Sequence, residues 1–70
     1  MINYGRRDWL RDMRTSRELT QTDVARMLGI SHDHYQRIEY GQRNPSSMLA
    51  RKIAVLFDFP MERFYEATAR

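Results

Sequence analysis

The chain has 70 residues, a formal net charge of +3 and no cysteine. Its length predicts one domain over residues 1–70, which buries only about 60% of its unfolded surface. The missing cysteines exclude disulfides and thiolate metal sites. The longest apolar run, residues 53–57, is too short for a signal peptide or a membrane span, so we expect a soluble, cytoplasmic protein.

The basic residues are mostly arginine and are unevenly spread. Eleven of the twelve are Arg, whose forked guanidinium suits phosphates and base edges better than lysine does. Residues 24–52 carry a net +3, against +1 for residues 1–23 and −1 for residues 53–70. This excess is compatible with nucleic-acid binding and equally with an ordinary basic surface.

The first half of the chain predicts two short helices. The first, over about residues 6–16, has apolar Leu10 and Met13, with Trp9 beside them. The second runs from about Gln21 to Leu28. It begins after Thr20, an N-cap with Asp23 three positions on, and ends at Gly29, which can adopt the left-handed conformation of a helix stop.

Three more helices are predicted in the second half, and no strand. Ser31 caps a helix over residues 32–40, which Gly41 closes. The turn at residues 44–46 starts a fourth helix, whose apolar stripe is Leu49, Ile53, Leu56 and Phe57. Pro60 breaks it, and a short fifth helix follows with Met61, Phe64 and Tyr65. Helix-breaking residues at such regular intervals along the chain predict a compact all-α fold of five helices.

The helix over residues 32–40 has two unlike faces when its residues are placed at 100° intervals. The inward face comprises Tyr35, Ile38 and Glu39. The outward face is polar throughout and comprises Asp33, Gln36, Arg37 and Tyr40, flanked by His32 and His34. Such an exposed helix, joined to its neighbour by a tight turn, enters the DNA major groove with its N-terminal side chains on base edges. The small Ala25 allows the two helices to cross closely.

A resemblance to a known family rests on residues 19–46, which read L-T-Q-T-D-V-A-R-M-L-G-I-S-H-D-H-Y-Q-R-I-E-Y-G-Q-R-N-P-S. This stretch resembles the Cro/CI-type (lambda-repressor-like, XRE-family) helix-turn-helix proteins, and the similarity extends to Leu10, Arg11, Arg14 and residues 52–54. The resemblance implies a five-helix lambda-repressor-like domain with the motif at the second and third helices. Tyr35 departs from the pattern, which more often has an aliphatic residue there, and this could widen the spacing of the two helices.

The resemblance also implies roles for individual residues. Base contacts would come from His32, Asp33, Gln36 and Arg37. Phosphate contacts would come from Thr20, Gln21, Tyr40, Gln42, Arg43 and Asn44. Both sets agree with the physics, because helix N-termini attract phosphate and groove-facing side chains read bases: arginine suits a guanine edge and aspartate a cytosine amino group.

Arg14 and Glu39 fall on inward stripes, where an isolated charge is costly. The family often pairs these two positions, so we expect a structural ion pair that ties the third helix to the first. Arg14 could also reach a DNA phosphate.

Other uses of the polar residues are less favoured. Asp33 and Arg37 stand four positions apart with the acid first, so they could simply form a surface ion pair. His32 and His34 point about 200° apart on a helix and cannot chelate one metal together. Nor does so small a domain suggest a catalytic pocket. We therefore expect no metal, no cofactor and no enzymatic activity.

The sequence thus predicts a small stand-alone regulator, of bacterial or phage type, that binds double-stranded DNA sequence-specifically and most simply acts as a transcriptional repressor. One recognition helix reads few base pairs, so we expect a homodimer on an inverted-repeat operator. The candidate dimer interface is Phe59, Met61, Phe64 and Tyr65, unless these residues merely cover the core of the monomer. The alternative function is a protein-interaction module of the same fold, such as an antitoxin-like partner of a toxin, with DNA binding secondary.

Overall fold

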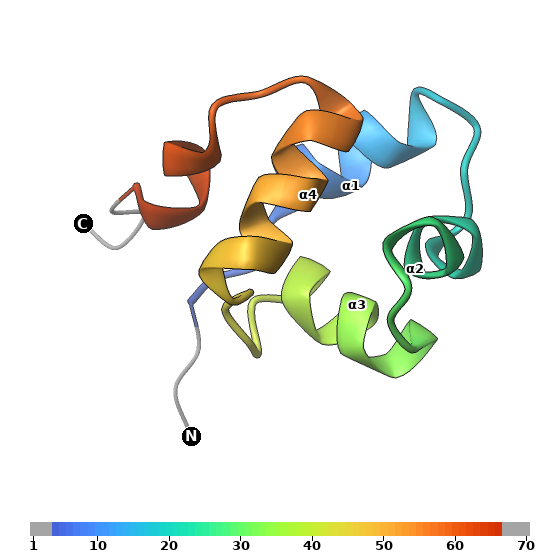
Figure 1. Ribbon diagram of the computed structural model, residues 1–70, viewed down its shortest axis with the longest axis horizontal. Helices are drawn as coiled ribbons and strands as arrows, with labels where there is room; N and C mark the ends of the chain where they lie inside the picture. The colour runs from blue at the N-terminus through green and yellow to red at the C-terminus, as the bar shows by residue number, and fades with distance from the viewer. Residues whose placement is uncertain (1–3, 67–70) are drawn as a thin grey trace.

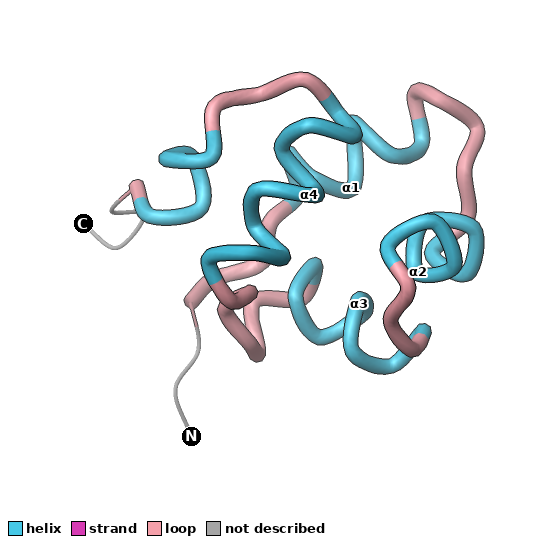
Figure 2. The backbone as a smooth tube through the Cα atoms, viewed as in Figure 1, coloured by secondary structure: helices cyan, strands magenta, loops and turns pink. Residues whose placement is uncertain are grey.

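A computed structural model describes residues 4–66, in which there are four α-helices, one 3₁₀-helix and no strand. The elements are α1 (Asp8–Thr15), α2 (Gln21–Leu28), α3 (His32–Glu39), α4 (Ser47–Phe57) and η1 (Met61–Tyr65). Figure 1 shows α4 crossing the middle of the molecule in front of α1, with α2 and α3 together on one side. Helices and connecting loops alternate along the whole described chain (Figure 2). The predicted all-α class is confirmed.

The predicted fifth α-helix is wrong, because residues 61–65 form a 3₁₀-helix instead. Its first N–H bond runs from Arg63 to the carbonyl of Pro60 over 3.0 Å, and no side chain caps its N-terminus. Five residues after a proline are too few to build up the i→i+4 ladder of an α-helix, whereas the tighter i→i+3 pattern is common in such short connecting pieces.

Capping residues set the limits of α2. The Thr20 hydroxyl accepts from the Asp23 N–H at 3.0 Å, and the Asp23 carboxylate accepts from the Thr20 N–H at 2.9 Å. This reciprocal capping box fixes the N-terminus, and Gly29 closes the helix at φ 74°. The hydrogen bonds hold the pKa of Asp23 below its ordinary value. Since these signals are local, the predicted limits of α2 match the observed ones.

The helices α1 and α3 are shorter than predicted. In α3 the Ser31 hydroxyl accepts from the His34 N–H at 3.0 Å, and Tyr40 lies just beyond the last helical residue as the C-cap. The helix α1 begins at Asp8 rather than residue 6. The N–H of Arg7 donates to the carbonyl of Glu39 over 2.8 Å, so the preceding residues follow the end of α3 instead of extending α1.

The core lies where α4 meets the other three α-helices. Its largest fully buried side chains are Tyr35, Phe57, Leu10, Ile38, Ile53 and Val24. Each α-helix therefore contributes at least one side chain of this set, so the core supports α3 from behind and leaves its other side to solvent. No helix within residues 4–66 has the length and apolar character needed to cross a bilayer.

The chain after α4 folds back and packs on α1. Trp9 meets Phe59 and Phe64 with ring centroids 5.1 and 5.5 Å apart, in the edge-on arrangement that aromatic rings prefer. Phe64 is 5% exposed and belongs to the core, so most of its surface is used inside the monomer, and its role in a dimer interface stays a prediction. Phe59 and Met61 are partly buried against the same core, whereas Tyr65 is 49% exposed.

Candidate nucleic-acid interface

The two helices α2 and α3 form one unit across a three-residue turn. The N–H of Ile30 reaches back to the carbonyl of Ala25 over 3.0 Å, which closes the end of α2. Ala25 is itself 2% exposed, so its small side chain lies within the contact region. Tyr35 is fully buried on the inward face of α3. A short turn and a buried face leave α3 little freedom to rotate.

The Tyr35 hydroxyl is buried and has no hydrogen-bond partner among the described residues. Burial, and secondarily the carboxylate of Glu39, raise the pKa of this phenol above its ordinary value. The tyrosine thus fits inside the core as a neutral ring. Whether it widens the spacing of α2 and α3 stays a prediction.

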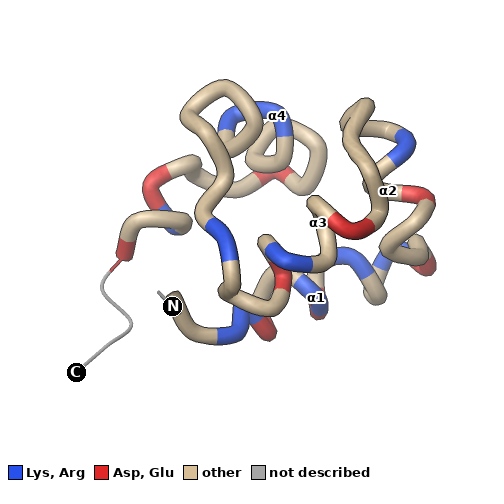
Figure 3. Tube along the Cα trace, turned by 90° about the horizontal axis from the view of Figure 1, so that it is seen from below, with Lys and Arg blue, Asp and Glu red and all other residues tan. Residues whose placement is uncertain are grey.

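The two faces of α3 have the burial that rotation along the helix predicts. Tyr35, Ile38 and Glu39 are buried, and His32, Asp33 and Arg37 are exposed. Gln36 and His34 are half-buried at the borders. Seen from below, α3 runs across the molecule with charged positions along it and on the loop that follows (Figure 3). The outward surface of α3 is thus polar and open to a partner.

A buried ion pair joins α3 to α1. Arg14 Nε lies 2.6 Å from Glu39 Oε2, Arg14 Nη2 lies 3.2 Å from Glu39 Oε1, and the side chains are 11% and 2% exposed. Burial by itself would raise the pKa of Glu39, but hydrogen bonds from Arg14 and Gln21 outweigh burial and hold that pKa below its usual value. Arg14 also donates to the carbonyl of Leu19 over 2.9 Å, so it links α1, the loop before α2, and α3.

Gln21 connects this ion pair to the outward face of α3. Its amide nitrogen donates to Glu39 Oε1 at 3.0 Å, and its amide oxygen lies 3.1 Å from His32 Nε2. The same oxygen accepts from Gln36 Nε2 at 3.4 Å, and that nitrogen lies 3.4 Å from the Tyr40 hydroxyl. Two predicted base-contacting residues and two predicted phosphate-contacting residues therefore belong to one hydrogen-bonded group.

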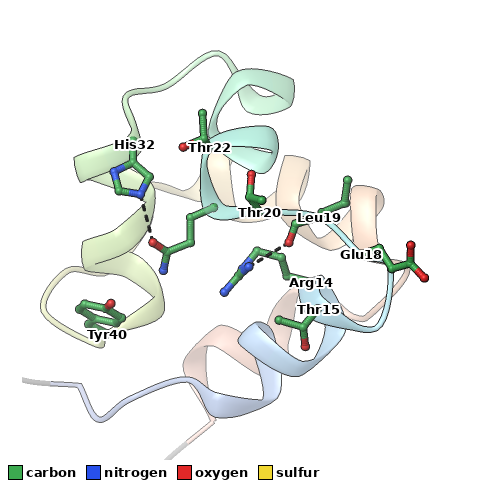
Figure 4. Close-up of a pocket in the computed structure, with 9 residues that line it drawn as sticks. Arg14, Thr15, Glu18, Leu19, Thr20, Thr22, His32 and Tyr40 are labelled. Carbon is green, nitrogen blue, oxygen red and sulfur yellow. Dashed lines mark hydrogen bonds between the residues drawn. The ribbon is translucent and has the colours of Figure 1, made fainter.

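A shallow, open hollow lies over this group. It is lined by residues of α1, α2, α3 and the loops beside them, including Arg14, Thr20, Gln21, His32 and Tyr40. Figure 4 shows the imidazole of His32 pointing at the Gln21 amide, and the guanidinium of Arg14 pointing at the carbonyl of Leu19. Thr20, Gln21 and Thr22, at the N-terminus of α2, line this hollow, and a helix N-terminus favours an anion.

Asp33 and Arg37 form an ion pair on the outward face. Arg37 Nε lies 2.9 Å from Asp33 Oδ2, and the side chains are 52% and 69% exposed respectively. Exposed pairs of this kind contribute about 0.3–0.5 kcal/mol, so the bond is easily exchanged for another partner. The surface ion pair that the sequence allowed is therefore present, and it leaves Arg37 available for a base.

Arg7 is a site residue that the sequence analysis missed. It is 5% exposed, and its guanidinium donates to the carbonyls of Ile38 at 2.6 Å and Arg43 at 3.2 Å, and to the Asn44 side-chain oxygen. Burial lowers its pKa relative to an ordinary arginine. Arg7 stands three positions before Leu10 and seven before Arg14, and this spacing on one helical stripe is the signal that could have found it.

The loop after α3 carries the remaining predicted phosphate contacts. Gln42 and Arg43 are exposed, and Tyr40 is half-buried. The side-chain oxygen Oδ1 of Asn44 accepts a hydrogen bond from Arg7, so this part of the Asn44 side chain has a structural role. Within the described residues no three His, Cys, Asp or Glu side chains gather as a metal site.

The short turn between α2 and α3, the buried inward face of α3 and its open polar surface define a helix-turn-helix protein. A profile of the helix-turn-helix family matches residues 10–64, and the chain belongs to this family. The resemblance to Cro/CI-type proteins is thereby confirmed.

Two curated relatives carry the same family designation. The uncharacterized HTH-type transcriptional regulator YqaF of Bacillus subtilis (strain 168) is 35% identical over 60 residues, which cover 86% of this chain and 79% of YqaF. The uncharacterized HTH-type transcriptional regulator MJ0272 of Methanocaldococcus jannaschii is 39% identical over 56 residues, which cover 80% of this chain and 85% of that protein. The similarity therefore spans most of each protein.

Proposed function

We propose that this chain binds double-stranded DNA sequence-specifically and regulates transcription, most simply as a repressor. The observation that carries the proposal is the pairing of an open polar face on α3 with a buried ion pair behind it. Exposed Asp33 and Arg37 supply an acceptor and a forked donor for base edges, while the Arg14–Glu39 pair fixes the helix that carries them. The printed descriptions of both relatives support the same function.

Base readout falls to the outward face of α3. Arg37 donates to a guanine edge, Asp33 accepts from a cytosine amino group, and His32 and Gln36 flank them. The Gln21 amide orients the last two, since it lies 3.1 Å from His32 Nε2 and 3.4 Å from Gln36 Nε2. A side chain already oriented by a hydrogen bond loses less conformational entropy on binding.

Phosphate contacts fall on either side of α3. Thr20 and Gln21 lie at the N-terminus of α2, where backbone N–H groups and the helix dipole favour an anion. Tyr40, Gln42, Arg43 and the amide group of Asn44 lie in the loop beyond α3. Contacts on both flanks set the register of the helix in the groove, and base contacts then discriminate among sequences.

The experiment is selection of binding duplexes from a random pool at physiological salt, repeated with Arg37→Ala and with Arg51→Ala as control. Arg51 is an exposed arginine of α4, so its removal changes the net charge equally without touching the proposed face. The wild type and Arg51→Ala should select one motif, and Arg37→Ala should lose preference at one base pair. Failure of the wild type to enrich any motif would contradict sequence-specific binding.

We propose further that the protein binds as a homodimer to an inverted repeat with half-sites about 10 bp apart or a multiple of that. The candidate interface is Tyr65 with the partly buried Phe59 and Met61. Tyr65→Glu should weaken operator binding while the circular dichroism spectrum stays unchanged. A single unrepeated half-site from selection, together with a monomer by sedimentation at hundreds of micromolar, would contradict the dimer.

A further inference from the structure

The backbone of residues 4–7, here called the N-terminal strap, lies against the end of α3. The N–H of Tyr4 donates to the carbonyl of Gly41 at 2.7 Å, and the N–H of Arg7 donates to the carbonyl of Glu39 at 2.8 Å. Gly41 has φ 78°, and a Cβ there would lie 2.0 Å from the carbonyl oxygen of Gly5. The strap therefore touches the loop that carries Tyr40, Gln42 and Arg43 with no room for a side chain between them.

Arg7 holds the strap in this position from inside. Its guanidinium lies 5.3 Å from the ring centroid of Phe64 and donates to backbone carbonyls at the end of α3 and in the following loop. A buried guanidinium with three acceptors is costly to displace, because each broken bond would leave an unpaired polar group. The strap is therefore held against the end of α3 both by its backbone hydrogen bonds and by the side chain of Arg7.

Arg6 points outward from this fixed strap. Its side chain is 58% exposed, and its guanidinium carbon lies 4.6 Å from the centroid of the Tyr40 ring. Asp8 Oδ1 lies 3.8 Å from Arg6 Nε, a long contact between two exposed groups that contributes little. A guanidinium that rests its face on an aromatic ring keeps its N–H donors at the edge, where they fit a phosphate.

We infer that Arg6 is a further phosphate-contacting residue, held in place by the Tyr40 ring, and that the DNA-binding surface extends from the helix-turn-helix motif onto the N-terminal strap. This inference rests on the proposed DNA binding. It adds a second exposed arginine to Arg43, on a strap whose backbone is hydrogen-bonded to the loop after α3 through the Tyr4 N–H and the Gly41 carbonyl. The partner chemistry is the DNA backbone, so the contact is independent of base sequence.

The test compares Arg6→Ala with Arg11→Ala by fluorescence anisotropy titration at 50–200 mM salt, with the selected operator and a scrambled duplex. Arg11 is the matched control, because it is also exposed and also lies near Asp8, at 3.6 Å, but does not contact the loop after α3. Arg6→Ala should weaken binding to both duplexes by the same factor. Its salt slope should fall by about 0.9, so the wild type loses about 3.5-fold more affinity over this salt range than the variant does.

The role of the Tyr40 ring is tested in two further backgrounds. Tyr40→Phe keeps the ring, so Arg6→Ala should still have its full effect there. Tyr40→Leu removes the ring, and Arg6→Ala should then cost a smaller factor, because the guanidinium is no longer held over the loop. Equal effects of Arg6→Ala in both backgrounds would overturn the role of the stacking.

The phosphate contact itself is overturned by either of two results. One is an unchanged salt slope for Arg6→Ala while Arg37→Ala still alters base preference, in which case the proposed function stands without the strap. The other is an equal loss for Arg6→Ala and Arg11→Ala, which would reflect net charge alone. Absence of duplex binding by the wild type would remove the proposed function and this inference together.

Discussion

Two arginine–carboxylate pairs lie on opposite faces of α3. Their N···O distances are similar, but the exposed fractions of their side chains are very different. Arg14 and Glu39 are 2.6 Å apart with side chains 11% and 2% exposed. Arg37 and Asp33 are 2.9 Å apart with side chains 52% and 69% exposed. Breaking a buried pair leaves an uncompensated charge in the core, whereas water replaces either partner of the exposed pair. The inward pair therefore holds the helix, and the outward pair is free to exchange partners.

The largest expected effect is on the inward pair. Glu39→Ala should lower the free energy of unfolding by about 3–5 kcal/mol, because Arg14 and the Gln21 amide lose their shared acceptor. Thermal or urea unfolding measures the change. Glu62→Ala, at an exposed position of η1, is the control and should change stability by less than about 0.5 kcal/mol. Similar melting of the two variants would contradict a structural role for Glu39.

Acid should weaken the inward pair through the same carboxylate. The pKa of Glu39 is lowered in the folded protein from its ordinary value of 4.5, so the stability it contributes is complete above that value and is lost as the pH falls through the folded pKa. Melting temperatures of the wild type and Glu39→Gln should differ most near neutral pH and converge as the pH falls below about 4.5. A constant difference across this range would contradict the assignment.

On the outward face the expected effect falls on binding rather than on folding. Arg37→Ala should cost about 1–3 kcal/mol of operator binding and relax preference at one base pair, with unfolding changed by less than about 0.5 kcal/mol. Arg43→Ala should instead weaken binding to all duplexes alike and reduce the salt slope by about one unit. Titration of operator and scrambled duplexes separates the two. If Arg37→Ala destabilised the fold, this would contradict the conclusion that only the inward pair stabilises α3.

The smallest expected effect is that of Asp33→Asn. It removes the charge from the exposed pair, so the free energy of unfolding should change by no more than about 0.5 kcal/mol. A shift of base preference at one position, seen in repeated selection, would sharpen the role of Asp33 as a base contact. Unchanged preference with slightly tighter binding to all duplexes would assign Asp33 solely to its pair with Arg37.

The sequence by itself determined the parts of this protein that depend on near neighbours. Thr20 and Asp23 cap α2 three residues apart, Gly29 stops it, and a 100° rotation per residue places Tyr35, Ile38 and Glu39 inward. These features rest on hydrogen bonds and periodicity within one or two turns, so reading along the chain is enough to find them. The family could be recognised from the sequence for the same reason, because its motif is one continuous stretch of the chain.

The tertiary structure alone decided which distant segments meet. It buried Arg7 under a loop 36 residues further along, joined Gln21 to His32 and Glu39, and placed Phe64 in the core. An arginine before a helix and a phenylalanine after one have the same local pattern whether they face solvent, a second subunit or their own core. Their burial depends on how residues 4–7 pack on α3 and residues 59–65 pack on α1, because the free energy gained there comes from contacts that no local periodicity encodes.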